Sequence, residues 1–338
     1  MRASRRSISG LTPAAAAALS VAAVLTLSAC GDGSSGTVTE DGRLRVTASF
    51  YPMQFLAEEI GGRHAEVSTL TKPGTEPHDL ELSPRQTGEL ADAGLIVYLK
   101  DMQPAVDEAI EQSGAEHVVE ASEFTSLEKH GGEEDGEDAG HAEEEGHAEE
   151  EADGGHEGHD HGGEDGGDPH IWLDPVRYAE VAEGVGKAMA KADPDHAAAY
   201  EKNAAELADR LRKLDGRFAA GLENRRTDTF ITTHAAFGYI ADRYGLVQES
   251  IKGLSPESEP SAARMKQLQD IAEDDGVTTV FFETLVSDKT ARTLAGDLGL
   301  RTDVLDPIEG VTDKSKGDDY FEIMEANLGA LQQALGAK

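Results

Sequence analysis

The sequence predicts an α/β fold with two lobes, each built on a parallel sheet, that are joined by a long rigid helix. Short apolar runs alternate with segments of helical periodicity in two separate series, the first beginning at Leu44 and the second at Thr229. A long helical pattern lies between the two series. Once a leader and an acidic insert are set aside, roughly 265 residues remain, which is enough for two domains of ordinary size.

The first series predicts four strands and three helices. Its clearest start signal is Ser83-Pro84, because serine is a good cap residue and proline suits the first helical turn. The alternation of strands and helices indicates a parallel sheet. The expected strands are residues 45–49, 66–70, 95–99 and 117–119, and the expected helices are residues 53–60, a helix opening at Ser83, and residues 102–112.

Two helices are expected between the series. Asp174-Pro175 begins the first, which reaches about residue 191, and Asp193-Pro194 begins the second, which reaches about residue 222. The second helix could be an ordinary packing helix, but its position between two strand–helix series favours a strut that links two lobes. Its apolar residues recur at steps of three and four: Tyr200, Ala204, Leu207, Leu211, Leu214 and Phe218.

The second series repeats the pattern of the first. We therefore expect a first lobe at residues 44–192, a linking helix at 193–224 and a second lobe at 225–338. The expected strands of the second lobe are residues 229–232, 246–251, 277–282 and 302–305, and its expected helices are residues 235–244, 261–273, 288–298 and 318–335.

The amino terminus predicts export. Three arginines precede an apolar, alanine-rich stretch at residues 11–27, which is too short for a comfortable membrane span and is typical of a signal peptide, here residues 1–29. Leu27-Ser28-Ala29-Cys30 resembles a bacterial lipobox, so we expect a lipid anchor at Cys30 and a flexible tether up to residue 43. This predicts an extracytoplasmic protein held at the outer face of the bacterial cell membrane. The alternative is a chance cysteine after an ordinary signal peptide.

Cys30 is the only cysteine, which excludes an internal disulfide and a cysteine-based metal site. The formal net charge of −36 makes nucleic acid an unsuitable partner.

An acidic, histidine-rich insert is predicted at residues 130–167. From His130 to Asp168 inclusive there are seventeen acidic residues and no Lys or Arg, and the near absence of apolar residues predicts disorder. Imidazole suits Zn, Ni and Cu better than harder ions, so we interpret the insert as a weak, multi-site metal loop. The alternative is a solvated acidic linker whose histidines are incidental. Its histidines are His130, His141, His147, His156, His159 and His161.

Candidate metal ligands lie in loops of the two lobes. In open α/β sheets ligands bind beyond the carboxyl ends of the strands. His78 and His234 each follow an expected strand, as do Asp306 and Glu309, and His170 lies where the insert rejoins the first lobe. Each has a simpler interpretation: an exposed loop residue, a core or capping histidine, or a turn carboxylate. Their shared placement, together with the insert, favours a metal site.

Five segments resemble the metal-binding solute-binding lipoproteins of bacterial ABC importers. The resemblance covers the chain from about Leu44 to its end. It implies two lobes linked by a rigid backbone helix, with one Zn or Mn ion in the cleft between them. The segments are Pro73-Gly74 to His78-Asp79, the run from Asp168 to Pro175, Tyr200 to Asn203, Thr233-His234 to Phe237, and Val280 to Glu283.

The resemblance also implies the ligand set. His78 and His170 would come from the first lobe, and His234 and a carboxylate from the second. Asp306 matches the usual position of the carboxylate and is slightly favoured, but Glu309 matches some zinc members. Glu283 is interpreted as a group that orients a histidine.

Zinc is the expected ion. The manganese members of the family generally carry a carboxylate where this chain has His234, and three imidazoles with one carboxylate form a softer site than two with two. Zinc members also carry histidine-rich inserts. We expect a monomeric, non-enzymatic protein that binds Zn²⁺ with high affinity outside the cytoplasm and delivers it to an ABC permease in the membrane.

Three alternatives stay open. The first is a manganese or other divalent-metal protein of the same transporter type. The second is a surface adhesin. The third is a zinc-dependent hydrolase that uses Glu283 or Glu309 as a base, although the sequence lacks an H-E-x-x-H motif.

Overall fold

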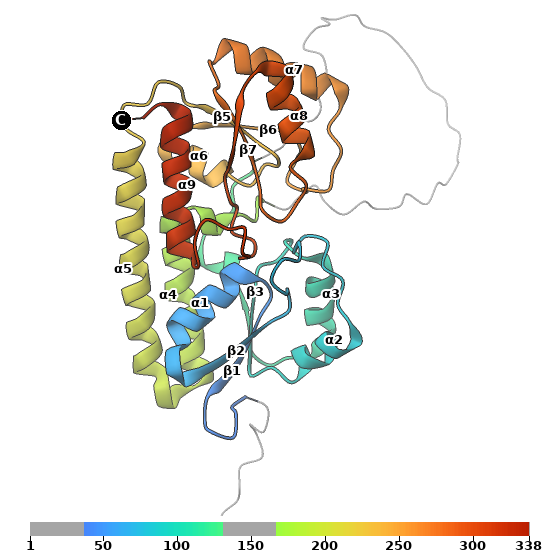
Figure 1. The fold of residues 1–338 in the computed structure, drawn as a ribbon. Helices are drawn as coiled ribbons and strands as arrows, with labels where there is room; N and C mark the ends of the chain where they lie inside the picture. Colours follow the sequence, from blue (N-terminus) through green and yellow to red (C-terminus); the bar gives the residue numbers. More distant parts are fainter. Residues whose placement is uncertain (1–36, 131–166, 338) are drawn as a thin grey trace, which may run out of the picture. The chain divides into compact units, whose positions relative to one another are not determined.

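Four parallel strands form the first sheet, in the order β2-β1-β3-β4. The computed structural model describes residues 37–130 and 167–337, which form part of one compact unit (Figure 1). The elements of the first lobe are β1 (Leu44–Ala48), α1 (Tyr51–Gly61), β2 (Ala65–Thr69), α2 (Pro84–Ala91), β3 (Leu95–Tyr98), α3 (Pro104–Ser113) and β4 (Val118–Glu120).

The second sheet repeats this strand order as β6-β5-β7-β8, and all its pairings are parallel. The two parallel sheets confirm the predicted fold class. The elements of the second lobe are β5 (Thr229–Thr232), α6 (Gly238–Tyr244), β6 (Val247–Ser250), α7 (Ala262–Asp274), β7 (Thr279–Phe282), α8 (Lys289–Leu298), β8 (Arg301–Val304) and α9 (Tyr320–Leu335).

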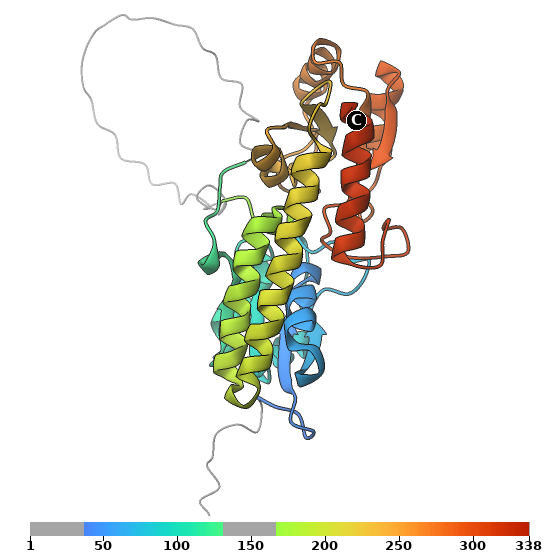
Figure 2. The same ribbon diagram turned by 90° about the vertical axis from the view of Figure 1, so that its left-hand side faces the viewer.

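Two long helices, α4 (Pro175–Ala192) and α5 (Ala197–Gly221), pack along each other (Figures 1 and 2). The apolar residues predicted to line the second of these helices are all buried. Asp193-Pro194 does not open α5 directly, because residues Pro194–His196 form a short 3₁₀ turn first. A Cβ on Gly186 would lie 2.5 Å from the Cβ of Ala204, so glycine permits the close packing of the two helices.

One hydrophobic core contacts both sheets. It includes Val46 of β1, Trp172, Leu211 of α5 and Phe230 of β5. The indole nitrogen of Trp172 donates to the carbonyl of Pro307 at 2.7 Å, which ties the segment before α4 to the loop after β8. The loops that carry the candidate ligands are therefore anchored to a common core.

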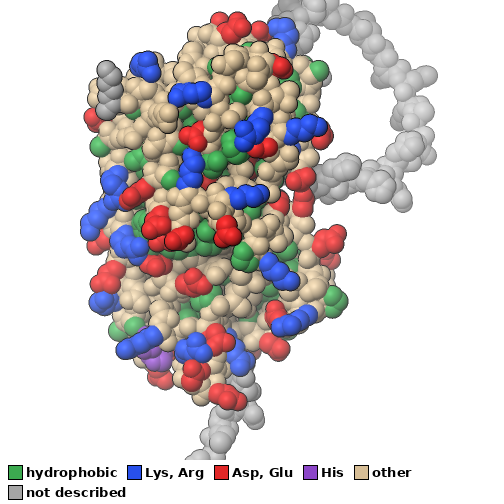
Figure 3. Space-filling model, in the orientation of Figure 1, with side chains coloured by type: hydrophobic (Ala, Val, Ile, Leu, Met, Phe, Trp, Pro, Cys, Tyr) green, Lys and Arg blue, Asp and Glu red, His purple; other side chains and the backbone are tan. Residues whose placement is uncertain are grey.

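The surface charge bears on binding to nucleic acid, and the length and apolar character of the helices bear on membrane insertion. On the face shown in Figure 3, acidic and basic side chains are interspersed, with no large basic area that would suit nucleic acid. Within residues 37–130 and 167–337, no helix has both the length and the apolar character needed to cross a bilayer.

Candidate metal site

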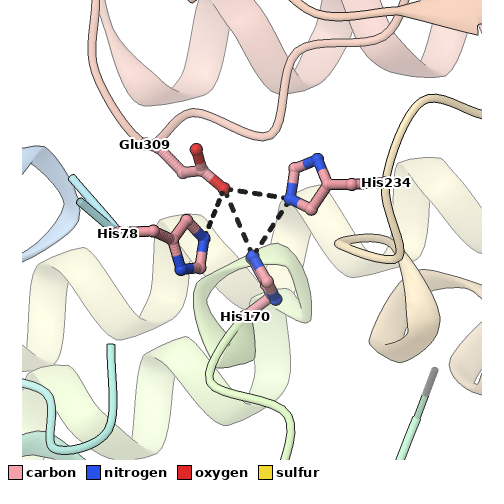
Figure 4. A group of neighbouring side chains, drawn as sticks. All are labelled: His78, His170, His234 and Glu309. Atoms are coloured by element: carbon pink, nitrogen blue, oxygen red, sulfur yellow. Dashed lines mark hydrogen bonds and ion pairs between the residues drawn. The ribbon is translucent and has the colours of Figure 1, made fainter. Parts of the chain in front are cut away.

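Four side chains converge between the loops of the two lobes: His78, His170, His234 and Glu309 (Figure 4). One nitrogen or oxygen from each lies within 4.8 Å of the others. Glu309 Oε1 is 3.4 Å from His78 Nε2, 3.2 Å from His170 Nε2 and 3.3 Å from His234 Nε2. The Nε2 atoms of His170 and His234 are 3.4 Å apart.

These four distances match four of the six edges of a tetrahedral zinc site, and the other two, from His78 to His170 and His234, lie within 4.8 Å. Bonds of about 2.0–2.1 Å from a tetrahedral Zn²⁺ to nitrogen or oxygen place neighbouring ligand atoms about 3.3–3.4 Å apart. His78 Nε2 and Glu309 Oε2 are buried without a hydrogen bond among the described residues. Buried polar atoms left without a partner in this way are costly, and a cation bound between the four side chains would satisfy them.

The loop after β2 presents His78. Gly74 has a φ of +81°, a conformation that glycine adopts readily, at the turn closed by the hydrogen bond from Thr75 N to Lys72 O. Four residues later the backbone N–H of His78 donates to Glu76 Oε1 at 3.1 Å. The side chain of His78 keeps 12% exposure, whereas those of His170, His234 and Glu309 are fully buried. Solvent therefore reaches the group from the His78 side.

A cavity of about 160 Å³ borders Glu309. Lys72 and Pro73 line it together with Glu309 and Gly310. These residues belong to the loops after β2 and β8, one from each lobe. Of the four residues in the group, only Glu309 lines this cavity.

Carboxylates orient two of the three imidazoles. Asp168 Oδ1 accepts from the backbone N of His170 at 2.9 Å and lies 2.6 Å from its Nδ1. Glu283 Oε1 lies 2.8 Å from Nδ1 of His234. A carboxylate at Nδ1 holds the proton on that nitrogen and leaves Nε2 free for a metal. The predicted role of Glu283 fits this position, whereas sequence reasoning assigned no such role to Asp168.

The fourth position differs from the favoured prediction, because Glu309 joins the group and Asp306 does not. Asp306 Oδ1 accepts from the backbone N of Ile308 at 2.9 Å, and its Oδ2 accepts from the Thr284 hydroxyl at 3.2 Å. The side chain of Asn327 in α9 bonds both the N–H and the carbonyl of Asp306. The carboxylate of Asp306 is thus used to hold the loop after β8.

Ile308 turns that loop toward the group. Its φ is +60°, which is rare for a β-branched residue and costs of order 1–3 kcal/mol. The next residue is Glu309, so the strained turn is what aims the carboxylate between the histidines. Asp306 and Ile308 together form the support, and Glu309 supplies the oxygen.

Trp172 and Asp174 follow His170 in the chain, and both side chains hold neighbouring segments in place. The indole of Trp172 holds the Pro307 carbonyl, as described above. Asp174 Oδ1 accepts from Val176 N at 2.8 Å and caps α4, and it also pairs with Arg243 of α6.

The side chains of His170, His234 and Glu309 shift one another's pKa values. Burial alone would lower the pKa of His170 and His234, but the neighbouring carboxylates outweigh it, and the pKa of His234 lies well above 6.5. Burial would raise the pKa of Glu309, yet the three imidazoles that face its carboxylate, His170, His234 and His78, hold it well below 4.5. The group can therefore take up protons or a cation in the same place.

Glu76 is a further acidic group that the sequence reasoning missed. Burial, and then the nearby charge of Glu309, raises the pKa of Glu76 to about 8. Its Oε2 is buried without a hydrogen bond among the described residues. Its position two residues before His78 was the available sequence signal.

Most of the predicted auxiliary residues lie outside the described part of the chain: Cys30, His141, His147, His156, His159 and His161. His130 is described, and both of its ring nitrogens contact carboxylates, those of Asp168 and Asp242. It therefore differs from the prediction of a histidine that is free to capture metal.

Residues 46–334 match the family model described as ZnuA, zinc-uptake complex component A, periplasmic. The chain belongs to this family. The resemblance seen in the sequence is thereby confirmed. The high-affinity zinc uptake system protein ZnuA of Bacillus subtilis is 37% identical over 322 residues, which cover 94% of this chain and 96% of that protein.

The zinc-binding lipoprotein AdcA of Streptococcus pneumoniae is 35% identical over 299 residues, or 87% of this chain. The aligned region spans only 56% of AdcA, about half its length. The crystal structure of the Zn(II)-bound ZnuA-like domain of AdcA has a TM-score of 0.68 and 32% identity, and the match covers 87% of this chain and 99% of that domain.

A third relative is described as bifunctional. The laminin-binding protein Lmb of Streptococcus agalactiae, described as having adhesin and metal-transporting activity, matches with a TM-score of 0.71 and 29% identity. The match covers 86% of this chain and 98% of Lmb.

Proposed function

We propose that this chain captures Zn²⁺ outside the cytoplasm and delivers it to an ABC permease. The observation that carries the proposal is the group of three imidazoles and one carboxylate, whose ligand atoms lie within 4.8 Å of one another and whose residues come from both lobes. Relatives named for zinc uptake and zinc binding support it. A site built from two lobes suits capture and release, because a shift of one lobe would separate the ligands.

Zinc is the proposed cargo rather than manganese. Three imidazoles favour a borderline ion such as Zn²⁺, whereas Mn²⁺ prefers more oxygen ligands. In a His234→Glu variant we expect the preference for zinc over manganese to fall, measured by competition between the two ions. Unchanged selectivity would count against the argument from ligand softness.

Binding without catalysis follows from the ligand number. Catalytic zinc sites keep one position open for water, whereas four protein ligands close a tetrahedral site. We propose that the protein is not an enzyme. Ester and peptide hydrolysis assays with and without a chelator test this, and metal-dependent turnover would favour the hydrolase alternative.

The amino-terminal residues, up to residue 43, would determine where the protein is located. We propose that residues 1–29 are a signal peptide, that Cys30 carries the lipid anchor and that residues up to 43 act as a tether. The lipoprotein name of AdcA supports this. Labelling with a fatty-acid analogue, compared between wild type and Cys30→Ala, tests the anchor. The lobe boundaries given above and a monomeric state belong to the same proposal.

Metal content gives the direct test of the proposed cargo. Protein purified without added ions and dialysed against a weak chelator should retain one zinc per chain. His170→Ala should lose it, whereas His117→Ala, which removes a histidine outside the group, should not. A wild-type protein that retains no zinc, or a His170→Ala variant that retains as much, contradicts the proposal.

Delivery requires a cellular test. A strain that lacks the chain should grow poorly in zinc-chelated medium. The wild-type gene should restore growth, and the His170→Ala gene should not. Equal rescue by both genes would separate the metal site from uptake.

Adhesion is a second candidate function, because the bifunctional Lmb is a close structural relative. If adhesion depends on the fold rather than on the ion, laminin binding should persist after substitution of His78 and His170. Surface plasmon resonance with immobilised laminin decides this. Binding could coexist with zinc transport.

A further inference from the structure

One buried carboxylate, Asp168, contacts two histidines. Its Oδ1 lies 2.6 Å from Nδ1 of His170, and its Oδ2 lies 2.7 Å from Nδ1 of His130. The side chain of Asp168 is fully buried. Asp168 therefore lies between a candidate zinc ligand and the residue with which the predicted insert begins.

His130 also reaches the second lobe. Its Nε2 lies 2.9 Å from Asp242 Oδ2 in α6, and its ring packs edge-on against Tyr239 at a centroid distance of 4.6 Å. The hydroxyl of Tyr239 donates to the carbonyl of Asp168 and accepts from the backbone N of Glu128. The two ends of the insert are thus joined to each other and to α6 around the His130 ring.

The fold leaves room for this ring. A Cβ on Gly238, the first residue of α6, would lie 2.4 Å from Cγ and 2.6 Å from Nδ1 of His130. Gly238 has no positive φ, so its backbone does not require glycine. The missing side chain is needed because His130 occupies that space, and only 11% of the His130 side chain remains exposed.

We infer that His130 is a positioning residue for the metal site: it holds Asp168 against His170 and thereby fixes the imidazole that faces the ion. This rests on the proposed function. Without His130, one oxygen of a buried carboxylate loses its partner, and the carboxylate is free to rotate away from His170. Outer partners of metal-bound histidines typically change affinity 10–100-fold. His130 acts one step further out, so we expect an effect of about tenfold.

The test compares two pairs of variants in the full-length mature protein. His130→Ala removes the ring, and His117→Ala removes a histidine outside the metal group and outside the insert as a matched control. Gly238→Ala displaces the ring without touching a titratable group. Its control is Gly296→Ala in α8 of the same lobe, where an added Cβ meets nothing within 4 Å.

Three measurements are made on each variant: the zinc dissociation constant, the zinc release rate and the absorption spectrum of the Co²⁺-substituted site. We expect His130→Ala and Gly238→Ala to release zinc about tenfold faster and to alter the Co²⁺ d–d bands. Both controls should match wild type. The spectrum reports the ligand geometry, which a general loss of stability would leave unchanged.

Two outcomes overturn the inference and are distinguishable. If wild type binds zinc tightly and His130→Ala matches His117→Ala in rate and spectrum, the positioning role falls and the proposed function stands. If wild type holds no zinc at all, both fall together. A Gly238→Ala variant that behaves like Gly296→Ala would show that the ring need not occupy its place.

Discussion

The two lobes share one strand order, yet they hold their halves of the metal site differently. Each lobe contributes one imidazole with a carboxylate at Nδ1, which is His170 with Asp168 in the first lobe and His234 with Glu283 in the second. Asp168 is two residues from its histidine, whereas Glu283 follows a neighbouring strand. The first arrangement is local and tied to the insert. The second depends on the pairing of β5 with β7.

The comparison teaches that two lobes with the same strand order can respond differently to substitutions near the metal site. Each sheet also packs one face on a smaller core of its own, against α2 and α3 in the first lobe and against α7 and α8 in the second. Damage to either small core should leave the other half of the site in place. Loss of a ligand, by contrast, should weaken zinc binding at the whole site, because the ion needs both halves.

The largest expected effect comes from removing one ligand from either lobe. His170→Ala and His234→Ala should each weaken zinc binding by about 100-fold or more, since the effect should exceed that of outer partners. Chelator competition measures the dissociation constants. If one variant keeps near-normal affinity, the site is not shared between the lobes.

The fourth position separates two neighbouring carboxylates of the second lobe. Glu309→Gln should weaken zinc binding by about 100-fold, while Asp306→Asn should act mainly on stability through the loop after β8. Zinc affinity and melting temperature are measured for both. A larger loss of affinity in Asp306→Asn would restore Asp306 as the ligand.

The orienting carboxylates test the contrast between local and non-local support. Asp168→Asn and Glu283→Gln should each weaken zinc binding about 10–100-fold. Asp168→Asn should also loosen the join at His130, because both oxygens of Asp168 are used, while Glu283 Oε2 has no hydrogen bond among the described residues. Hydrogen exchange of residues 128–130 reports the second effect. Equal exchange in the two variants would contradict it.

The stability of the zinc-free protein should depend on pH. The raised pKa of His234 adds stability that is complete below pH 6.5 and is lost as pH rises through that pKa. The lowered pKa of Glu309 adds stability that is present above pH 4.5 and is lost as pH falls through that pKa. Both contributions coincide between pH 4.5 and 6.5.

Zinc replaces the protons, so the gain in melting temperature on adding zinc should grow as pH rises above 6.5. Each kcal/mol corresponds to about 2–4 °C for a chain of this size. Differential scanning calorimetry with and without zinc from pH 5 to pH 8.5 measures it. A zinc effect that shrinks with rising pH would be the wrong sign.

The smallest expected effect concerns the insert. We propose from its composition that the insert raises the local zinc concentration or senses zinc abundance, while the four-residue group binds the ion tightly. Deleting residues 131–166, which keeps His130 and Asp168, should leave the tight dissociation constant within about twofold and lower the total zinc capacity. Loss of the tight site on deletion would refute this division of roles.

Local sequence signals predicted much of the fold. The predicted strand 229–232 coincides with β5, and Ser83 caps α2 as predicted, with reciprocal bonds to Gln86. Three of the four residues in the group were predicted, and the fourth was the weaker of two candidates. The sequence left the choice between Asp306 and Glu309 open because both follow β8, and residue type does not tell which side chain turns inward.

What the sequence by itself determined is the set of parts: two strand–helix series, a long helix between them, and histidines in loops beyond strand ends. Periodicity, caps and residue chemistry are local properties, so one chain suffices to read them. Only the tertiary structure decided that Glu309 faces the histidines. That orientation depends on the φ of Ile308 and on the two hydrogen bonds between the Asn327 side chain and the Asp306 backbone. The tertiary structure likewise decided that Asp168 joins His170 to His130, because contacts between distant segments depend on how the core packs.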